Sequence, residues 1–163
     1  SFITGKDENI KIEVSLRQQP IDKPVYNVIK HFYQDPFTGE NLIPENKILS
    51  LSLNEAIAEK LKAAITRKDA AIRDYYDLWH LAEAKFNFHD KRFVELFRMK
   101  LDAEGYKGNF AHNFGLEQGK VDLLHRQVET DLMPVIRADE QFDLGKVFER
   151  FDEILAHKSF KDK

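Results

Sequence analysis

Two charged residues, Lys60 and Asp74, stand at positions where the sequence pattern predicts packing rather than solvent. At about 100° per residue, Lys60 falls about 20° from Leu53, within the apolar stripe of a helix expected from Ser52 to about Thr66. An unpaired ammonium is costly to bury, so this lysine is expected to meet a carboxylate, meet an anionic ligand, or extend its stem to reach water.

Asp74 supplies a candidate carboxylate on the next expected helix, from Ala70 to Lys85. It projects at the edge of an apolar arc, and Asp77 faces the same side one turn later. Arg67 falls on the side of Lys60, and Arg73 lies beside Asp74. This pattern has two interpretations: a Lys60–Asp74 ion pair that joins two helices, or a cationic site prepared for a phosphate-bearing ligand.

Charged residues in three further segments fall on faces that the pattern assigns to solvent. Glu13 lies on the polar side of an alternating strand, where it becomes a metal ligand only if other carboxylates converge on it. Glu55 and Lys62 occupy the face of their helix opposite Lys60. The helix expected at residues 90–104 carries basic residues that suit either a phosphate backbone or an ordinary wet face: Lys91, Arg92, Arg98 and Lys100.

The elements that must position these residues follow from periodicity and turn residues. Strict alternation predicts a strand at 10–18, and weaker signals predict strands at 25–33 and 48–52. Helices are expected at 53–66, 70–85, 90–104, 120–132 and 144–157, with 106–119 as a loop. Strands followed by helices indicate an α+β chain, divided into a partial sheet region (1–52) and a helical domain (53–163).

Composition excludes several classes of protein. The 163 residues carry a formal charge of −3 and no cysteine, which excludes disulfides, thiolate nucleophiles and cysteine-based zinc sites. The six histidines show no metal-ligating spacing. No apolar run is long enough to span a membrane and no signal peptide is visible, which fits the cytoplasm. The start in a strand without an initiator methionine indicates that earlier residues once supplied neighbouring strands.

Three segments in order resemble one family. They are KIEVS (11–15), LNEAIAEKLKAAITR (53–67) and RDYYDLWHL (73–81). The run E-x-x-x-E-K-L-x-A…R…R-D-x-Y-D-L is similar to the later motifs of the AbiEii/AbiGii abortive-infection toxins, which are polymerase β-like nucleotidyltransferases.

The resemblance implies transfer of a nucleoside monophosphate from an NTP to an RNA (tRNA-like) or protein acceptor, with Mg²⁺ as cofactor, in a toxin–antitoxin or phage-defence system. It implies that Lys60 and Asp74 are catalytic, that Arg67, Arg73 and Asp77 bind substrate, and that Glu13 helps to hold the metal. An antitoxin protein is the expected partner.

The chain departs from the family pattern in one respect. The family's first motif is a Gly-Ser or Gly-Gly-Thr turn followed by two metal-binding acids spaced D-x-D, and no D-x-D occurs in these 163 residues. We therefore expect the chain alone to be inactive, as the C-terminal part of such an enzyme. The alternative is a non-catalytic α+β interaction module with a structural Lys60–Asp74 pair and a partner-binding third helix.

Overall fold

A computed structural model describes residues 19–29 and 34–161. Within these ranges, two antiparallel strands precede five α-helices and three short helical turns, so the α+β prediction is confirmed. The elements in order are β1 (Val25–Val28), β2 (Lys47–Ser50), α1 (Leu53–Thr66), α2 (Ile72–Glu83), α3 (Lys91–Ala103), η1 (Asn113–Gly115), α4 (Gln118–Gln127), η2 (Val128–Leu132), α5 (Leu144–Ala156) and η3 (Lys158–Phe160). The strand expected at 10–18, with Glu13, lies outside the described residues.

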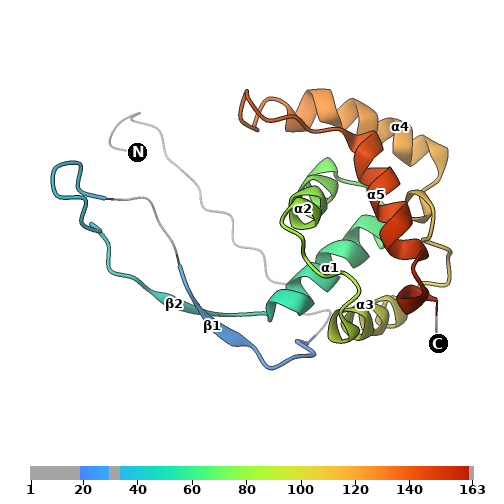
Figure 1. Ribbon diagram of the computed structural model, residues 1–163, viewed down its shortest axis with the longest axis horizontal. Coiled ribbons are helices and arrows are strands. Elements are labelled where there is room, and N and C mark those ends of the chain that lie inside the picture. Colours follow the sequence, from blue (N-terminus) through green and yellow to red (C-terminus); the bar gives the residue numbers. More distant parts are fainter. Residues whose placement is uncertain (1–18, 30–33, 162–163) are drawn as a thin grey trace.

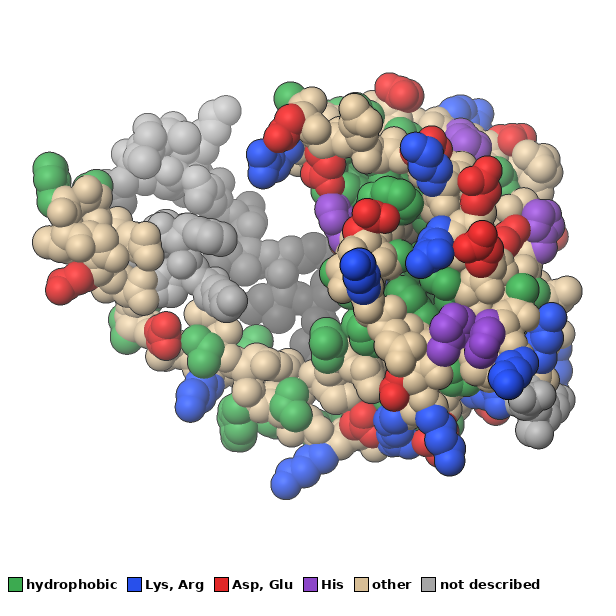
Figure 2. Space-filling model, viewed as in Figure 1, with side chains coloured by type: hydrophobic (Ala, Val, Ile, Leu, Met, Phe, Trp, Pro, Cys, Tyr) green, Lys and Arg blue, Asp and Glu red, His purple; other side chains and the backbone are tan. Residues whose placement is uncertain are grey.

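The strands form a hairpin that extends away from the helical bundle (Figure 1). Val25 lies opposite Ser50 and Val28 opposite Lys47. Apolar side chains point to both faces of this ribbon and are well exposed, with Tyr26 72% and Leu49 57% accessible. Figure 2 shows these apolar side chains along the hairpin, whereas acidic and basic side chains are interspersed over the bundle.

The helices begin and end where the sequence signals predict, within a few residues. Ser52 caps α1 by accepting a hydrogen bond from the Glu55 N–H, and Asp90 caps α3 by accepting one from the Phe93 N–H. Gly105 follows α3 with a φ of +68°, the left-handed conformation that closes a helix without a Cβ clash. The expected fourth helix ends as an α-helix at Gln127 and continues as a π turn, η2.

Helix α1 lies at the centre of the bundle, in contact with α2 and with α3 (Figure 1). Because it has neighbours on two sides, its buried arc covers about half of its circumference, from Ile57 and Ala64 through Leu61 to Lys62 and Glu55. The sequence interpretation centred this arc on Leu53, which is 68% exposed. Lys60 therefore lies at the edge of the buried arc and not within it.

The core between the helices is largely aromatic. Phe114, from the segment expected to be a loop, is fully buried and packs edge-on against Tyr75 with ring centroids 5.1 Å apart. It also stacks on Phe151 at 5.1 Å. Its φ of +55° is strained for an aromatic residue, and this burial holds it there. The loop is thus part of the core.

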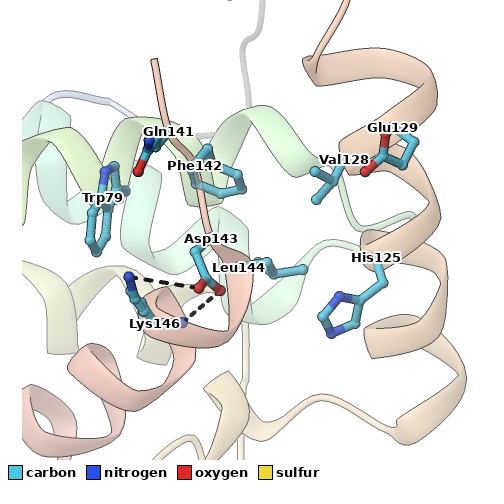
Figure 3. Close-up of a pocket in the computed structure, with 9 residues that line it drawn as sticks. All are labelled: Trp79, His125, Val128, Glu129, Gln141, Phe142, Asp143, Leu144 and Lys146. Carbon is cyan, nitrogen blue, oxygen red and sulfur yellow. Dashed lines mark hydrogen bonds and ion pairs between the residues drawn. The ribbon is translucent and has the colours of Figure 1, made fainter. Parts of the chain in front are cut away.

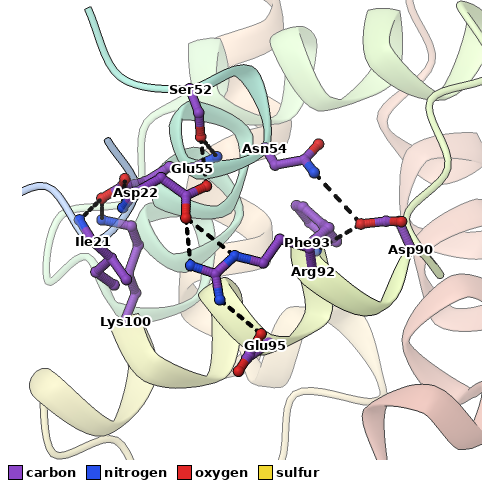
Figure 4. A network of polar contacts seen from close by, with 10 residues as sticks. All are labelled: Ile21, Asp22, Ser52, Asn54, Glu55, Asp90, Arg92, Phe93, Glu95 and Lys100. Carbon is purple, nitrogen blue, oxygen red and sulfur yellow. Dashed lines mark hydrogen bonds and ion pairs between the residues drawn. The ribbon is translucent and has the colours of Figure 1, made fainter. Parts of the chain in front are cut away.

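The largest correction to the sequence analysis concerns Glu55, which is fully buried rather than on a solvent face. Its carboxylate accepts hydrogen bonds from the N–H groups of Ile21 and Asp22, both at 2.9 Å, and lies 3.0 Å from the Lys100 ammonium (Figure 4). The side chain of Asp22 in turn contacts Ser52 and Arg92. These contacts attach the segment before β1 to α1 and α3.

Lys62 and Lys100, also expected on wet faces, are buried and belong to the same network. Lys62 is 6% exposed and its ammonium lies 3.0 Å from Glu104, and it also contacts Glu59. Lys100 is 3% exposed and lies 3.0 Å from Glu59. We call these five residues, Glu55, Glu59, Lys62, Lys100 and Glu104, the α1–α3 ion network. The prediction that Lys100 belongs to a solvent-exposed basic face of α3 is therefore wrong.

We predict that Glu55→Gln lowers the free energy of unfolding by about 3 kcal/mol, because its amide group directs N–H donors toward the buried Lys100 ammonium. The matched control is Glu95→Gln, on the exposed surface of α3, which should change it by less than about 0.5 kcal/mol. Urea unfolding followed by circular dichroism measures both. Equal losses for the two variants would contradict a buried ionic role for Glu55.

The same carboxylate should make stability depend on acid pH. Burial alone raises the pKa of Glu55, but hydrogen bonds from Ile21, Asp22 and Lys100 outweigh it, and the pKa is lowered below its usual value. A lowered pKa stabilises the fold above the unfolded-state value, about 4.3, and this contribution is lost as pH falls through the folded-state value. Below about pH 4 the wild type should lose stability more steeply than Glu55→Gln. Parallel profiles would contradict this assignment.

Candidate functional site

Lys60, Arg67, Asp74 and Asp77 meet between α1 and α2. The Lys60 ammonium contacts the Asp77 carboxylate directly and lies 3.9 Å from Asp74 Oδ1. Arg67 Nη1 lies 3.1 Å from Asp74 Oδ2. The structure thus brings together four of the six residues singled out in the sequence, although the nearest partner of Lys60 is Asp77 and the nearest cation to Asp74 is Arg67. We call these four residues the α1–α2 charge cluster.

The burial of the cluster is uneven. The Asp74 side chain is only 6% exposed, whereas those of Lys60, Arg67 and Asp77 are 34%, 38% and 44% exposed. Asp74 Oδ2 is buried and accepts no well-aligned hydrogen bond, since Arg67 approaches it without favourable angles. A buried carboxylate therefore faces two cations whose other sides remain open to solvent.

The fold beneath the cluster holds α2 in register with α1. Tyr75, the residue after Asp74, is fully buried and its hydroxyl donates a 2.6 Å hydrogen bond to the Ala64 carbonyl on α1. Burial, followed by the neighbouring Asp74 charge, raises the pKa of Tyr75 well above its usual value, so this hydroxyl remains a donor. The side chains of Ile72 and Leu78 are buried on the same helix. Asp74 is therefore fixed in position by its neighbours in the sequence.

Two of the six predicted site residues do not join the cluster. Arg73 is exposed and, within the described part of the chain, makes no ion pair. Glu13 lies outside the described residues, and its role as a metal ligand stays a prediction.

Two open cavities lie beside α1 and α2. One of about 550 Å³ is lined by residues of α2, α4, η2, the segment before α5 and the first turn of α5, among them Trp79, His125, Phe142 and Lys146 (Figure 3). The other, of about 940 Å³, runs along α1 from Leu51 to Arg67 and reaches Arg73. Lys60, Asp74 and Asp77 line neither cavity. Arg67 and Arg73 line the larger one.

Residues 2–157 of the chain match the model of a known protein family. This stretch matches the model described as nucleotidyl transferase AbiEii toxin, Type IV TA system. The chain belongs to the AbiEii nucleotidyl transferase toxin family. No curated protein and no solved structure matches it. The match confirms the resemblance drawn from the motifs around Lys60 and Asp74.

The family places the chain in a toxin–antitoxin system, which implies a nucleotide substrate and an antitoxin. Within residues 19–29 and 34–161, no helix is long and apolar enough to cross a membrane.

The described residues of this AbiEii chain do not by themselves fit a magnesium site. Mg²⁺ requires several oxygen ligands in octahedral geometry. Asp74 and Asp77 converge, but both carboxylates face cations, and no group of three potential ligands occurs in the described ranges.

The exposure of Lys60 predicts a small role in stability. Its contact with Asp77 joins two partly exposed side chains, and such pairs contribute about 1 kcal/mol or less. We expect Lys60→Met to change the free energy of unfolding by less than about 1 kcal/mol. Asp74→Leu, which removes the shared carboxylate and leaves Arg67 without its carboxylate partner, should cost more. Chemical denaturation measures both, and a loss of several kcal/mol for Lys60→Met would indicate a structural staple.

Proposed function

We propose that this chain is the part of a nucleotidyltransferase toxin that carries the phosphate-binding lysine, in an enzyme that transfers a nucleoside monophosphate from an NTP to an RNA acceptor. The observation that supports it best is the Lys60 ammonium. This ammonium lies between Asp77 and the buried Asp74, and the Lys60 side chain is about a third exposed. The chain that carries it belongs to the AbiEii family. A lysine that served only to pack the two helices would add little stability here, because its side chain is partly exposed.

Each member of the α1–α2 charge cluster has a role in the proposal. Lys60 neutralises negative charge that develops on the phosphates during transfer. Asp74, held by Arg67, orients Lys60 or the acceptor hydroxyl, and Asp77 holds the ammonium until the substrate replaces it. Arg67 and Arg73 bind further phosphate oxygens, because guanidinium groups match their geometry.

The remaining parts of the proposal come from the family. Nucleotidyltransferases generally use divalent metals, and we propose Mg²⁺ with Glu13 among its ligands. We propose that residues 1–52 belong to the nucleotidyltransferase sheet and 53–163 to the helical domain. The acceptor is proposed to be a tRNA-like RNA, with a protein acceptor as the alternative, and the reaction to take place in the cytoplasm.

The second candidate function is a non-catalytic interaction module. The exposed apolar residues on the β1–β2 hairpin favour it, because contiguous apolar surface of this kind marks interaction sites. In that case the α1–α2 charge cluster would only join two helices.

Label transfer from a radioactive NTP to total tRNA distinguishes the two. We expect the 163-residue chain alone to be inactive, since it contains no D-x-D acids. The product of the complete reading frame should transfer label in Mg²⁺, and Lys60→Met should lower this by about 10²- to 10³-fold, the range for removal of one transition-state charge.

The matched control is Lys91→Met, an exposed lysine on α3, which should retain full transfer. Lys60→Met with wild-type transfer rates would overturn the proposed role of the lysine. Mg²⁺-dependent transfer by the 163-residue chain alone would contradict the expectation of inactivity.

A further inference from the structure

The larger of the two cavities is a groove with an uneven distribution of charge. Its floor is the α1–α3 ion network, in which carboxylates and ammonium groups pair with one another. Its other end, at the α1–α2 turn, is lined by Arg67, Lys68 and Arg73, with Asp69 as the acid among them. Positive charge therefore accumulates at one end of the groove, although the chain as a whole carries −3.

The cations at this end are available to a ligand. Lys68 and Arg73 are exposed and form no ion pair with any described residue. Lys120 adds a fourth positive charge to the turn, because its ammonium donates a 3.1 Å hydrogen bond to the Arg67 carbonyl. Arg67 contacts Asp74 through Nη1 while its side chain also lines the groove, so it links the groove to the α1–α2 charge cluster.

The position of these cations argues for a polymer. Arg67 meets Asp74 beside Lys60 and also lines the groove, whereas Lys60 does not line it. The groove cations therefore continue beyond the position of Lys60, as the phosphates of a strand whose reacting end lies at Lys60 would require. The groove is also open and holds about 940 Å³, much more than a single phosphate fills.

We propose that Arg67, Lys68, Arg73 and Lys120 bind the phosphodiester backbone of the acceptor RNA. This proposal rests on the proposed function for the identity of the acceptor, and it moves Arg67 and Arg73 from the nucleotide to the acceptor. Backbone contacts of this kind give affinity without sequence preference and weaken as salt rises.

The test is fluorescence anisotropy of a labelled single-stranded RNA oligonucleotide, titrated with the 163-residue chain at several salt concentrations and without NTP. Lys68→Ala/Arg73→Ala should weaken binding by about tenfold and lower the slope of log K against log salt by about 1.4, the value for two single-strand phosphate contacts. Lys91→Ala/Lys107→Ala, which removes the same charge from exposed lysines elsewhere, should bind as the wild type does.

The outcomes separate this proposal from the proposed function. Lys60→Met should bind RNA normally while losing transfer, so a failure of catalysis leaves the RNA result intact. Equal weakening in both double variants would mean that binding follows net charge alone and would overturn the site. Displacement of the RNA by free ATP from the wild type but not from Lys68→Ala/Arg73→Ala would assign the groove to the nucleotide and contradict the proposal. Unchanged affinity in Lys68→Ala/Arg73→Ala would contradict it as well.

Discussion

The buried carboxylate of Asp74 is the constraint on which the arrangement of α1 and α2 depends. It is 6% exposed and faces two cations from α1, Arg67 at 3.1 Å and Lys60 at 3.9 Å. Because these cations are seven residues apart on one side of α1, the carboxylate can face both only in one rotation of α2 about its axis. The Tyr75 hydroxyl bound to the Ala64 carbonyl fixes the same rotation from the interior.

Helix α1 contributes to two charged clusters that differ in the burial of their cations. On the side of α3, Glu55, Lys62 and Lys100 are almost fully buried and their charges are satisfied within the protein. On the side of α2, one acid is buried while Lys60 and Arg67 remain about a third exposed. Buried cations that are paired within the protein stabilise an interface, whereas partly exposed cations beside a fixed carboxylate can exchange a protein partner for a ligand. This difference is the physical reason for proposing phosphate chemistry at α2.

The sequence predicted the helices well because their signals are local. Ser52, Asp90 and Gly105 mark helix ends through contacts within a few residues, and the structure confirms them. The motif residues Lys60, Arg67 and Asp74 were also found together, since they lie on two consecutive helices.

The sequence could not predict the partners that lie far away in the chain. Glu55 pairs with Lys100, and Lys62 with Glu104, across more than 40 residues. A count along one helix assumes one buried face, whereas α1 has two neighbours, so its charged positions facing α3 were assigned to solvent. The burial of Phe114 was not predicted for a related reason. Its segment has the composition of a loop, and the residues that bury it, Tyr75 and Phe151, lie far away in the sequence.

The most direct measurement is two-dimensional NMR of the lysine side-chain CH₂–NH₃⁺ groups during titration with an Mg²⁺–NTP complex. We predict a saturable shift of the Lys60 signal, while the signals of Lys62 and Lys100, which are buried and paired with carboxylates, stay unchanged. An unmoved Lys60 signal at saturating nucleotide, or shifts confined to lysines outside the α1–α2 interface, would contradict it.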